Sequence, residues 1–154
     1  QGGASVGDHD LVAKVSADLG MERSFYKVAM RPGKPLMAGS IGKNAMVGLP
    51  GNPVSAMVCG HIFLRPMIQS MLGTNHVSLP LMTAVLSHDL AANGPREHYM
   101  RATLEPGSRF PRVTPDTRQD SSLLSVLSRA DALMVYPPSA GPLCAGSLVD
   151  ILRI

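Results

Sequence analysis

Two positively charged side chains stand in a short turn that two prolines stiffen. The segment reads Arg31-Pro32-Gly33-Lys34-Pro35. Because proline holds φ at about −65°, the turn presents Arg31 and Lys34 at nearly fixed positions. A rigid pair of cations suits a doubly charged oxyanion or a phosphate, since little ordering remains to oppose binding. The alternative is a pair of solvated charges in an ordinary turn.

A second stretch, Gly48-Leu49-Pro50-Gly51-Asn52-Pro53-Val54-Ser55, joins a short apolar run to a long one. Its prolines and glycines fix the turn. Asn52 is a suitable helix N-cap, and Pro53 suits the first helical turn. The N–H groups and the positive dipole end of such a helix favour an oxyanion. The alternative is a capped strand-to-helix connection that binds no ligand.

A third candidate is the glycine-rich turn over residues 1–10, which leads into a helix. Asp8 can cap that helix, an apolar stripe from Leu11 to Leu19 follows, and Gly20 ends it. A glycine-rich loop before a helix N-terminus is receptive to anions. A tight turn with no ligand is the alternative, with Asp10 acting only as a partner of the helix dipole.

The distribution of charge limits the classes of partner. The net charge is +3, yet residues 1–74 carry seven Lys or Arg against four Asp or Glu, whereas residues 75–154 carry seven of each. All four lysines lie in the first half. This pattern indicates a local anion site and not a surface that coats nucleic acid, which needs clustered basic runs.

The cysteines and the longest apolar run indicate the cellular setting. The two cysteines have no metal-site spacing, which favours a reduced, cytoplasmic protein. The run from Val54 to Leu72 contains His61, Arg65 and Pro66, so we expect no membrane span. The sequence opens on Gln1 inside a turn and is expected to be a piece of a longer protein.

Hydrophobic patterning predicts an α/β region in the first half. Strands are expected over residues 25–30, 36–41 and 45–49, with a hairpin turn at 42–44. A helix is expected from Val54 to Leu72, and Pro66 should kink or divide it because it cannot donate to the Ile62 carbonyl.

The second half is predicted to be mostly β. Partly alternating segments at 79–86, 98–104, 132–136 and 147–154 are separated by Pro/Gly turns, which suggests a small β-barrel or sandwich. One or two helical turns are expected between Ser122 and Arg129. Arg101 lies at a polar strand position that faces either a cleft or solvent.

Taken together, three motifs resemble the molybdopterin molybdenumtransferase family, which includes bacterial MoeA and the gephyrin E domain. These motifs are residues 2–10, residues 27–35 and residues 48–56, and they occur in the family's order. The resemblance extends over the whole chain. It implies a partial three-layer molybdopterin-binding α/β subdomain at 1–74 and a small C-terminal β-barrel subdomain at 75–154, without the family's earlier subdomains.

The resemblance implies an enzymatic activity in molybdenum cofactor biosynthesis. In this family, adenylylated molybdopterin and molybdate give the molybdenum cofactor and AMP with the help of a divalent cation, usually Mg²⁺. The step needs a tetrahedral dianion held in a fixed geometry, so neutralisation of charge would do most of the work. We expect little or no turnover from this chain alone.

The motifs carry the family's functional positions onto this sequence. Asp10 matches an acid that would hold the metal or position water. Lys27, Arg31 and Lys34 match basic positions for the pterin phosphate, adenylate or molybdate; many members have Lys at position 31, where arginine binds an oxyanion as a planar fork. The remaining residues implied to shape the cleft are Pro35, Pro50, Asn52, Pro53 and Ser55.

The resemblance also implies substrate-binding residues in the barrel. Residues 96–101 resemble the family's arginine-bearing strand, and residues 119–122 resemble its serine-containing loop. Arg101 and Ser122 would complete a molybdate pocket between the two subdomains. Ser121 is the alternative to Ser122, since family members commonly have glycine at the first of these positions.

The same resemblance leaves two other functions open and implies several partners. A scaffold module that docks receptor peptides, as the gephyrin E domain does, is one alternative, and a molybdopterin adenylyltransferase is the other. The barrel and the Arg31–Pro35 turn weigh against the latter. The resemblance implies a homodimer, with the adenylyltransferase and molybdoenzyme apoproteins as partners, and neither nucleic acid nor membrane.

Overall fold

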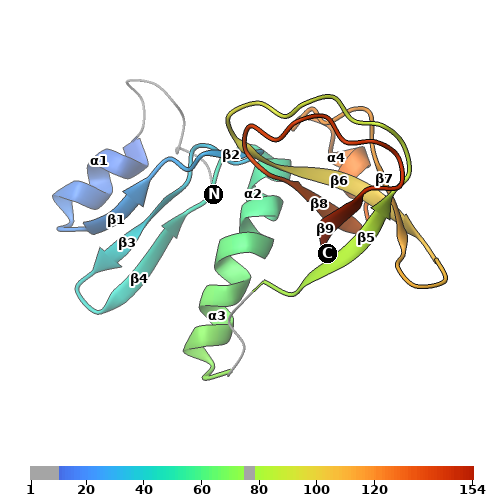
Figure 1. Cartoon of the computed structure of the whole chain (residues 1–154). Coiled ribbons are helices and arrows are strands. Elements are labelled where there is room, and N and C mark those ends of the chain that lie inside the picture. The colour runs from blue at the N-terminus through green and yellow to red at the C-terminus, as the bar shows by residue number, and fades with distance from the viewer. Residues whose placement is uncertain (1–10, 75–78) are drawn as a thin grey trace. The chain divides into compact units, whose positions relative to one another are not determined.

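The computed structural model describes residues 11–74 and 79–154, and the chain divides into two compact units, Gln1–Val77 and Ser78–Ile154. The first unit is a mixed α/β structure and the second is a closed β-barrel (Figure 1). Within the described residues, every helix is too short or too polar to span a bilayer.

A three-stranded antiparallel sheet forms the centre of the first unit. Its strands are β1 (Glu22–Tyr26), β3 (Met37–Ile41) and β4 (Asn44–Gly48), in the order β1-β3-β4. Ile41 pairs with Asn44, so only Gly42 and Lys43 form the hairpin turn. Gly42 adopts a φ of 57°, a conformation that glycine tolerates well. The predicted hairpin is therefore present, with a turn one residue shorter than expected.

Helices cover both faces of this sheet. The hydroxyl of Ser16 on α1 (Leu11–Asp18) lies 3.6 Å from the sulfur of Met46 on β4. The ring of Phe25 on β1 lies 6.1 Å, centroid to centroid, from that of Phe63 in the long helical segment. Met46 pairs with Gly39 and Phe25 with Ala38. Because neighbouring strand residues point to opposite faces, the two contacts are on opposite sides and the unit has three layers.

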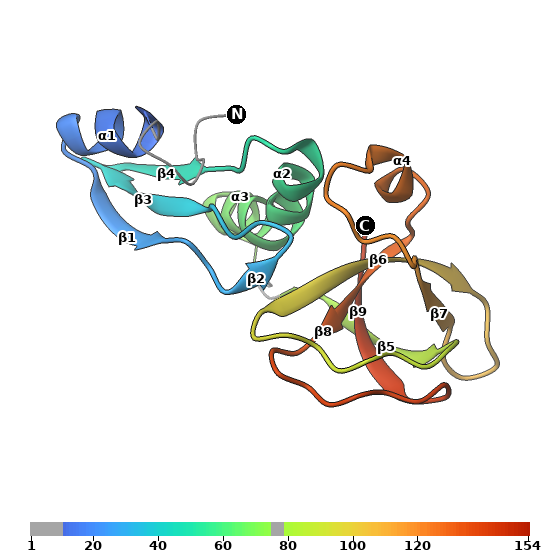
Figure 2. The ribbon, with the colours of Figure 1, turned by 90° about the horizontal axis from the view of Figure 1, so that it is seen from above.

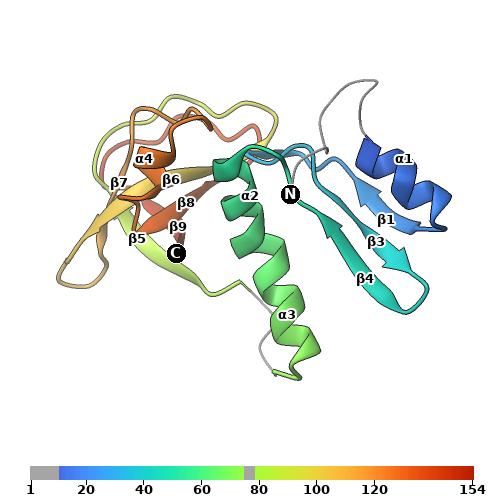
Figure 3. The same ribbon diagram turned by 180° about the vertical axis from the view of Figure 1, so that it is seen from behind.

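The long helical segment contains one wide turn. It consists of α2 (Pro53–Cys59), the π-helical turn η1 (Gly60–Leu64) and α3 (Arg65–Met71), which together form one continuous rod (Figure 3). The N–H of Arg65 bonds to the carbonyl of Gly60, five residues earlier. Pro66 follows directly. Its ring would crowd the preceding turn of a regular α-helix. The helix therefore changes to a π-helical turn just before Pro66, the residue predicted to kink or divide it.

The strand predicted over residues 25–30 is wrong in its extent. The structure ends β1 at Tyr26 and places only a two-residue strand, β2 (Met30–Arg31), further on. Lys27 has a φ of 67°, which directs the chain out of the strand. A positive φ at a non-glycine residue cannot be seen in the sequence pattern.

The second unit closes five strands into a ring (Figure 2). They are β5 (Leu81–Leu86), β6 (Glu97–Glu105), β7 (Arg112–Pro115), β8 (Ala132–Tyr136) and β9 (Leu148–Arg153). The order is β6-β7-β5-β9-β8, and an antiparallel β6–β8 pairing closes the barrel. Closure removes the exposed edges of an open sheet.

Apolar side chains fill the barrel, and a short helix lies outside it. The core cluster includes Ala84, Leu86, Val113, Met134 and Ile151, each completely buried. Helix α4 (Leu124–Leu127) connects β7 to β8, within the range where helical turns were expected. The sequence analysis missed β7, because it is only four residues long and ends in a proline. That strand pairs in parallel with β5 and antiparallel with β6.

Candidate functional site

Backbone hydrogen bonds close the predicted basic turn into a compact loop. The N–H of Lys27 donates to the Leu36 carbonyl at 2.8 Å, and the N–H of Val28 donates to the Lys34 carbonyl at 3.1 Å. The side chains of Arg31 and Lys34 are exposed on this loop. The ammonium of Lys27 lies 4.9 Å from the centre of the Tyr26 ring, a favourable cation–π distance. The loop therefore carries three cations on a constrained backbone.

The tip of this loop packs against helix α2. Pro32 and Gly33 are buried, the Arg31–Pro32 peptide bond is cis, and Gly33 has a φ of 109°. A Cβ on Gly33 would lie 2.4 Å from the sulfur of Cys59, so only glycine fits. Burial raises the pKa of the Cys59 thiol to about 12, which keeps it protonated and apolar at neutral pH. The cations beside the tip are thus carried by a loop locked onto the helix.

The second motif forms a capped helix start. The side-chain oxygen of Asn52 accepts a hydrogen bond from the N–H of Ser55 at 3.2 Å, and the Asn52 carbonyl accepts one from Ala56. Pro53 has no N–H to offer. Pro50 is fully buried and Ser55 nearly so. The cap accounts for most of the N–H groups of the first turn. The structure therefore directly supports the alternative in which Asn52 and Ser55 form the cap of a strand-to-helix connection.

Helix α2 connects two of the three motifs, those at residues 27–35 and 48–56. The turn at Pro50–Ser55 begins α2, and the basic loop contacts Cys59 at its other end. Six residues separate Pro53 from Cys59, which is about 9 Å along a helix axis. The structure therefore brings Lys27, Arg31, Lys34 and Pro35 together in one loop, and positions that loop relative to the Pro50–Ser55 turn through one short helix.

Arg101 is the central residue of the candidate site in the barrel unit. It lies on β6 and is completely buried. Its Nε donates to the side-chain oxygen of Gln119 at 3.1 Å, and its Nη1 donates to the Asp120 carbonyl at 3.0 Å. Both acceptors are neutral, so these two bonds orient the guanidinium without cancelling its charge.

The loop after β7 ties Ser122 to this arginine through Asp120. The Asp120 carboxylate accepts a hydrogen bond from the N–H of Ser122 at 2.8 Å. The pKa of the Asp120 carboxyl is lowered mainly by a hydrogen bond from the backbone of Ser122, and to a smaller extent by one from its side chain. The positive charge of Arg101 lowers the pKa further. Ser122 is exposed, whereas Ser121 is half-buried. Arg101 and Ser122 therefore belong to one hydrogen-bonded loop.

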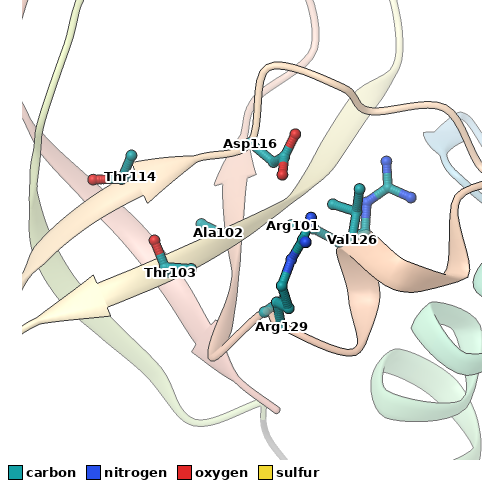
Figure 4. A pocket seen from close by; sticks show the side chains of 8 residues that line it. Arg101, Ala102, Thr103, Thr114, Asp116, Val126 and Arg129 are labelled. Atoms are coloured by element: carbon teal, nitrogen blue, oxygen red, sulfur yellow. The ribbon is translucent and has the colours of Figure 1, made fainter.

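A pocket of about 170 Å³ opens beside Arg101 on the outside of the barrel (Figure 4). Thr103 of β6 and Thr114 of β7 lie opposite each other in the strand register. The remaining wall combines Asp116 with residues at and after α4, among them Val126 and Arg129. Sequence reasoning did not select Asp116, Gln119 or Arg129, because only the folded loop brings them to β6.

The residues described in the structure do not test the expected metal site. Asp10 lies outside the described residues. Across residues 11–74 and 79–154, three or more His, Cys, Asp or Glu side chains do not gather in any one place where they could hold a metal ion. The role assigned to Asp10 and the requirement for Mg²⁺ stay predictions from the family resemblance.

Comparisons with known families agree with both units. The probable molybdopterin binding domain matches residues 1–70, and the MoeA C-terminal region, domain IV, matches residues 83–154. The class is therefore that of molybdenum cofactor biosynthesis proteins. Taken together, the two matches cover nearly all of the sequence, and the chain belongs to the MoeA family.

Relatives agree with this family, and a solved structure shares the fold. A molybdopterin molybdenumtransferase of Bacillus subtilis is 31% identical over 153 residues, and one of Nostoc sp. is 32% identical over 159. Each match covers 99% of this chain and 36% of the relative, so the chain spans little more than a third of their length. A crystal structure of a MoeA protein from Pyrococcus horikoshii shares the fold, with a TM-score of 0.74 at 24% identity over 94% of this chain and 34% of that one.

Proposed function

We propose that this chain takes part in inserting molybdate into adenylylated molybdopterin, with release of AMP. The relatives named molybdopterin molybdenumtransferase support this step. The observation that carries the proposal is the buried Arg101, whose hydrogen bonds to Gln119 and Asp120 hold its guanidinium in place beside a pocket. A fixed cation of this kind stabilises a small oxyanion without reorganising when the anion arrives.

The loop of the first unit supplies further positive charge for the same chemistry. Arg31 and Lys34 flank a tip that is locked onto α2, and Lys27 is held near Tyr26. In this proposal the guanidinium of Arg31 binds an oxyanion through two parallel N–H groups, and Lys34 acts as a point charge. Charge neutralisation by such groups lowers the cost of bringing molybdate close to a phosphate-bearing substrate.

Binding of molybdate, measured by calorimetry, tests the proposal. We expect Arg101→Ala and Lys34→Ala each to weaken binding by about tenfold, the loss expected when a charge-assisted hydrogen bond is removed. Lys43→Ala is the matched control, because Lys43 is an exposed lysine in the β3–β4 turn. Unchanged affinity in an Arg101→Ala, Lys34→Ala double variant would refute the proposed roles of both cations.

The partners and the metal are part of the proposal as well. Mg²⁺, a homodimer, and contacts with the molybdopterin adenylyltransferase and molybdoenzyme apoproteins are implied only by the family resemblance. The cytoplasmic location is implied only by the two unpaired cysteines, Cys59 and Cys144.

A further inference from the structure

The side-chain amide of Gln119 continues the hydrogen bonding of a neighbouring strand beside Arg101. Strand β7 ends at Pro115, which pairs with Ala102, and the N–H of the next residue, Asp116, donates to the Arg101 carbonyl at 2.9 Å. The N–H of Arg101 donates to the Gln119 side-chain oxygen at 3.0 Å. The Gln119 amide nitrogen donates back to the Arg101 carbonyl, also at 3.0 Å. One side chain therefore accepts the N–H of a buried strand residue and shares its carbonyl with the N–H of Asp116.

The same amide also holds the arginine side chain. The oxygen that accepts the N–H of Arg101 accepts its Nε at 3.1 Å as well. The amide nitrogen of Gln119 is in turn fixed by the Asp116 carbonyl at 2.7 Å. Because the Asp120 carbonyl holds Nη1, the guanidinium is held at two of its nitrogens by two consecutive residues of one loop. These bonds set both the direction and the plane of the guanidinium.

We propose that Gln119 is a positioning residue that orients Arg101 for oxyanion binding. The consequence for binding rests on the proposed function, whereas the positioning itself does not. An amide suits this role because it offers an acceptor and a donor and carries no charge. A carboxylate in its place would keep the acceptor but would pair with the guanidinium and lose the donor.

The positioning is tested without any ligand, by NMR of the arginine Nε–H groups in the whole chain. We expect a distinct Nε–H resonance of Arg101 that exchanges slowly with solvent, assigned by its loss in Arg101→Lys. In Gln119→Ala this resonance should move and its exchange should become faster, because the acceptor is gone. In Gln119→Glu, which keeps an acceptor, the resonance should stay protected. If Gln119→Ala does not fold, Gln119→Glu still tests the role of Gln119 through its affinity for molybdate.

Molybdate titration then tests the consequence for binding. We expect Gln119→Glu to weaken molybdate binding by about tenfold, because the new carboxylate competes with the anion for Arg101. Gln69→Glu makes the same change of charge on α3 and should leave the affinity unchanged. Gln119→Ala should also weaken binding, through loss of orientation and not through charge.

The outcomes separate this inference from the proposed function. An Nε–H resonance that stays protected in Gln119→Ala overturns the positioning role. Equal affinity for molybdate in the original chain and in both Gln119 variants overturns its relevance to binding. If the original chain binds no molybdate but the resonance responds to Gln119→Ala as expected, the proposed function fails and the positioning of Arg101 by Gln119 is supported.

Discussion

Packing at single atoms decides which residues can support the cationic loop. Gly33 lies against the sulfur of Cys59 and has a positive φ, so two independent constraints require glycine there. The sequence shows Gly33 between two prolines and therefore predicts a stiff turn, which the structure contains. It does not show that Cys59, 26 residues later, is the surface against which the turn closes. That contact depends on the tertiary fold.

Replacing Gly33 by alanine should destabilise the first unit. The positive φ costs about 1–2 kcal/mol, and the clash of the new Cβ with the Cys59 sulfur adds about 1–3 kcal/mol of overpacking. Chemical denaturation measures the loss. Gly42→Ala is the matched control, because its φ is 57° but nothing lies within 4 Å of a Cβ there, so only the backbone cost applies.

A double-variant cycle isolates the clash from the backbone strain. Cys59→Ala removes the sulfur that a Cβ on residue 33 would meet. The Gly33→Ala, Cys59→Ala variant should therefore lose less stability than the sum of the two single variants. Strict additivity would show that the loop does not close on Cys59.

The two thiols should differ in reactivity. Burial raises the pKa of Cys59 to about 12, so at pH 8 the thiol is almost wholly protonated and does not attack a disulfide reagent. Cys144 is exposed. A thiol-reactive dye should modify one cysteine quickly in the native chain at pH 8 and both after denaturation. Rapid reaction at two thiols in the native chain, or retention of the fast reaction in Cys144→Ser, would contradict the buried position of Cys59.

At the scale of elements, the sequence predicts strongly patterned segments better than short ones. The residues of β8 are those expected, and β5, β6 and β9 differ only at their ends, because alternation and Pro/Gly turns mark them. Strand β7 was missed because it is only four residues long and ends in a proline. Lys27 shows the opposite failure, since a β-forming run continues through the residue at which a positive φ ends the strand.

The candidate site shows the same division between local and distant information. Family motifs in the sequence indicate Arg31, Lys34 and Arg101, and the structure places the first two in one loop and the third in a hydrogen-bonded strand. Gln119 received no role, because a glutamine that bonds to a strand 18 residues earlier leaves no periodic pattern. Side-chain bonds to distant backbone groups can be found only once the loop has folded.

The start of α2 should depend on the Asn52 cap. Asn52→Ala removes the acceptor for the Ser55 N–H and should lower the stability of the first unit by about 1 kcal/mol. Asn52→Asp keeps a side-chain acceptor at the same position and should retain most of that stability. Chemical denaturation of both variants measures the difference. Equal stability of Asn52→Ala and the original chain would show that the hydrogen bond contributes nothing.

At the scale of the whole molecule, each unit has its own set of buried residues. The α/β unit buries Leu36, Met37, Val54 and Val58, and the barrel buries its separate cluster around Met134. A segment with its own core can unfold as its own cooperative unit. Hydrogen exchange, followed segment by segment in the whole chain, therefore reports the stability of each core separately.

Met134→Ala should loosen the barrel throughout and leave the helices of the first unit protected. Met134 is fully buried on β8, which pairs with both β6 and β9, so the cavity would weaken two neighbouring pairings of the closed ring. A loss of about 2–5 kcal/mol is expected for such a substitution. Exchange should become faster across β5–β9, while α2 and α3 keep their original rates.

Val58→Ala, which truncates a fully buried side chain of α2, should give the reverse pattern. If either variant accelerated exchange equally in both units, the two cores would form a single cooperative structure, and substitutions in the cationic loop could no longer be interpreted without measuring the barrel as well.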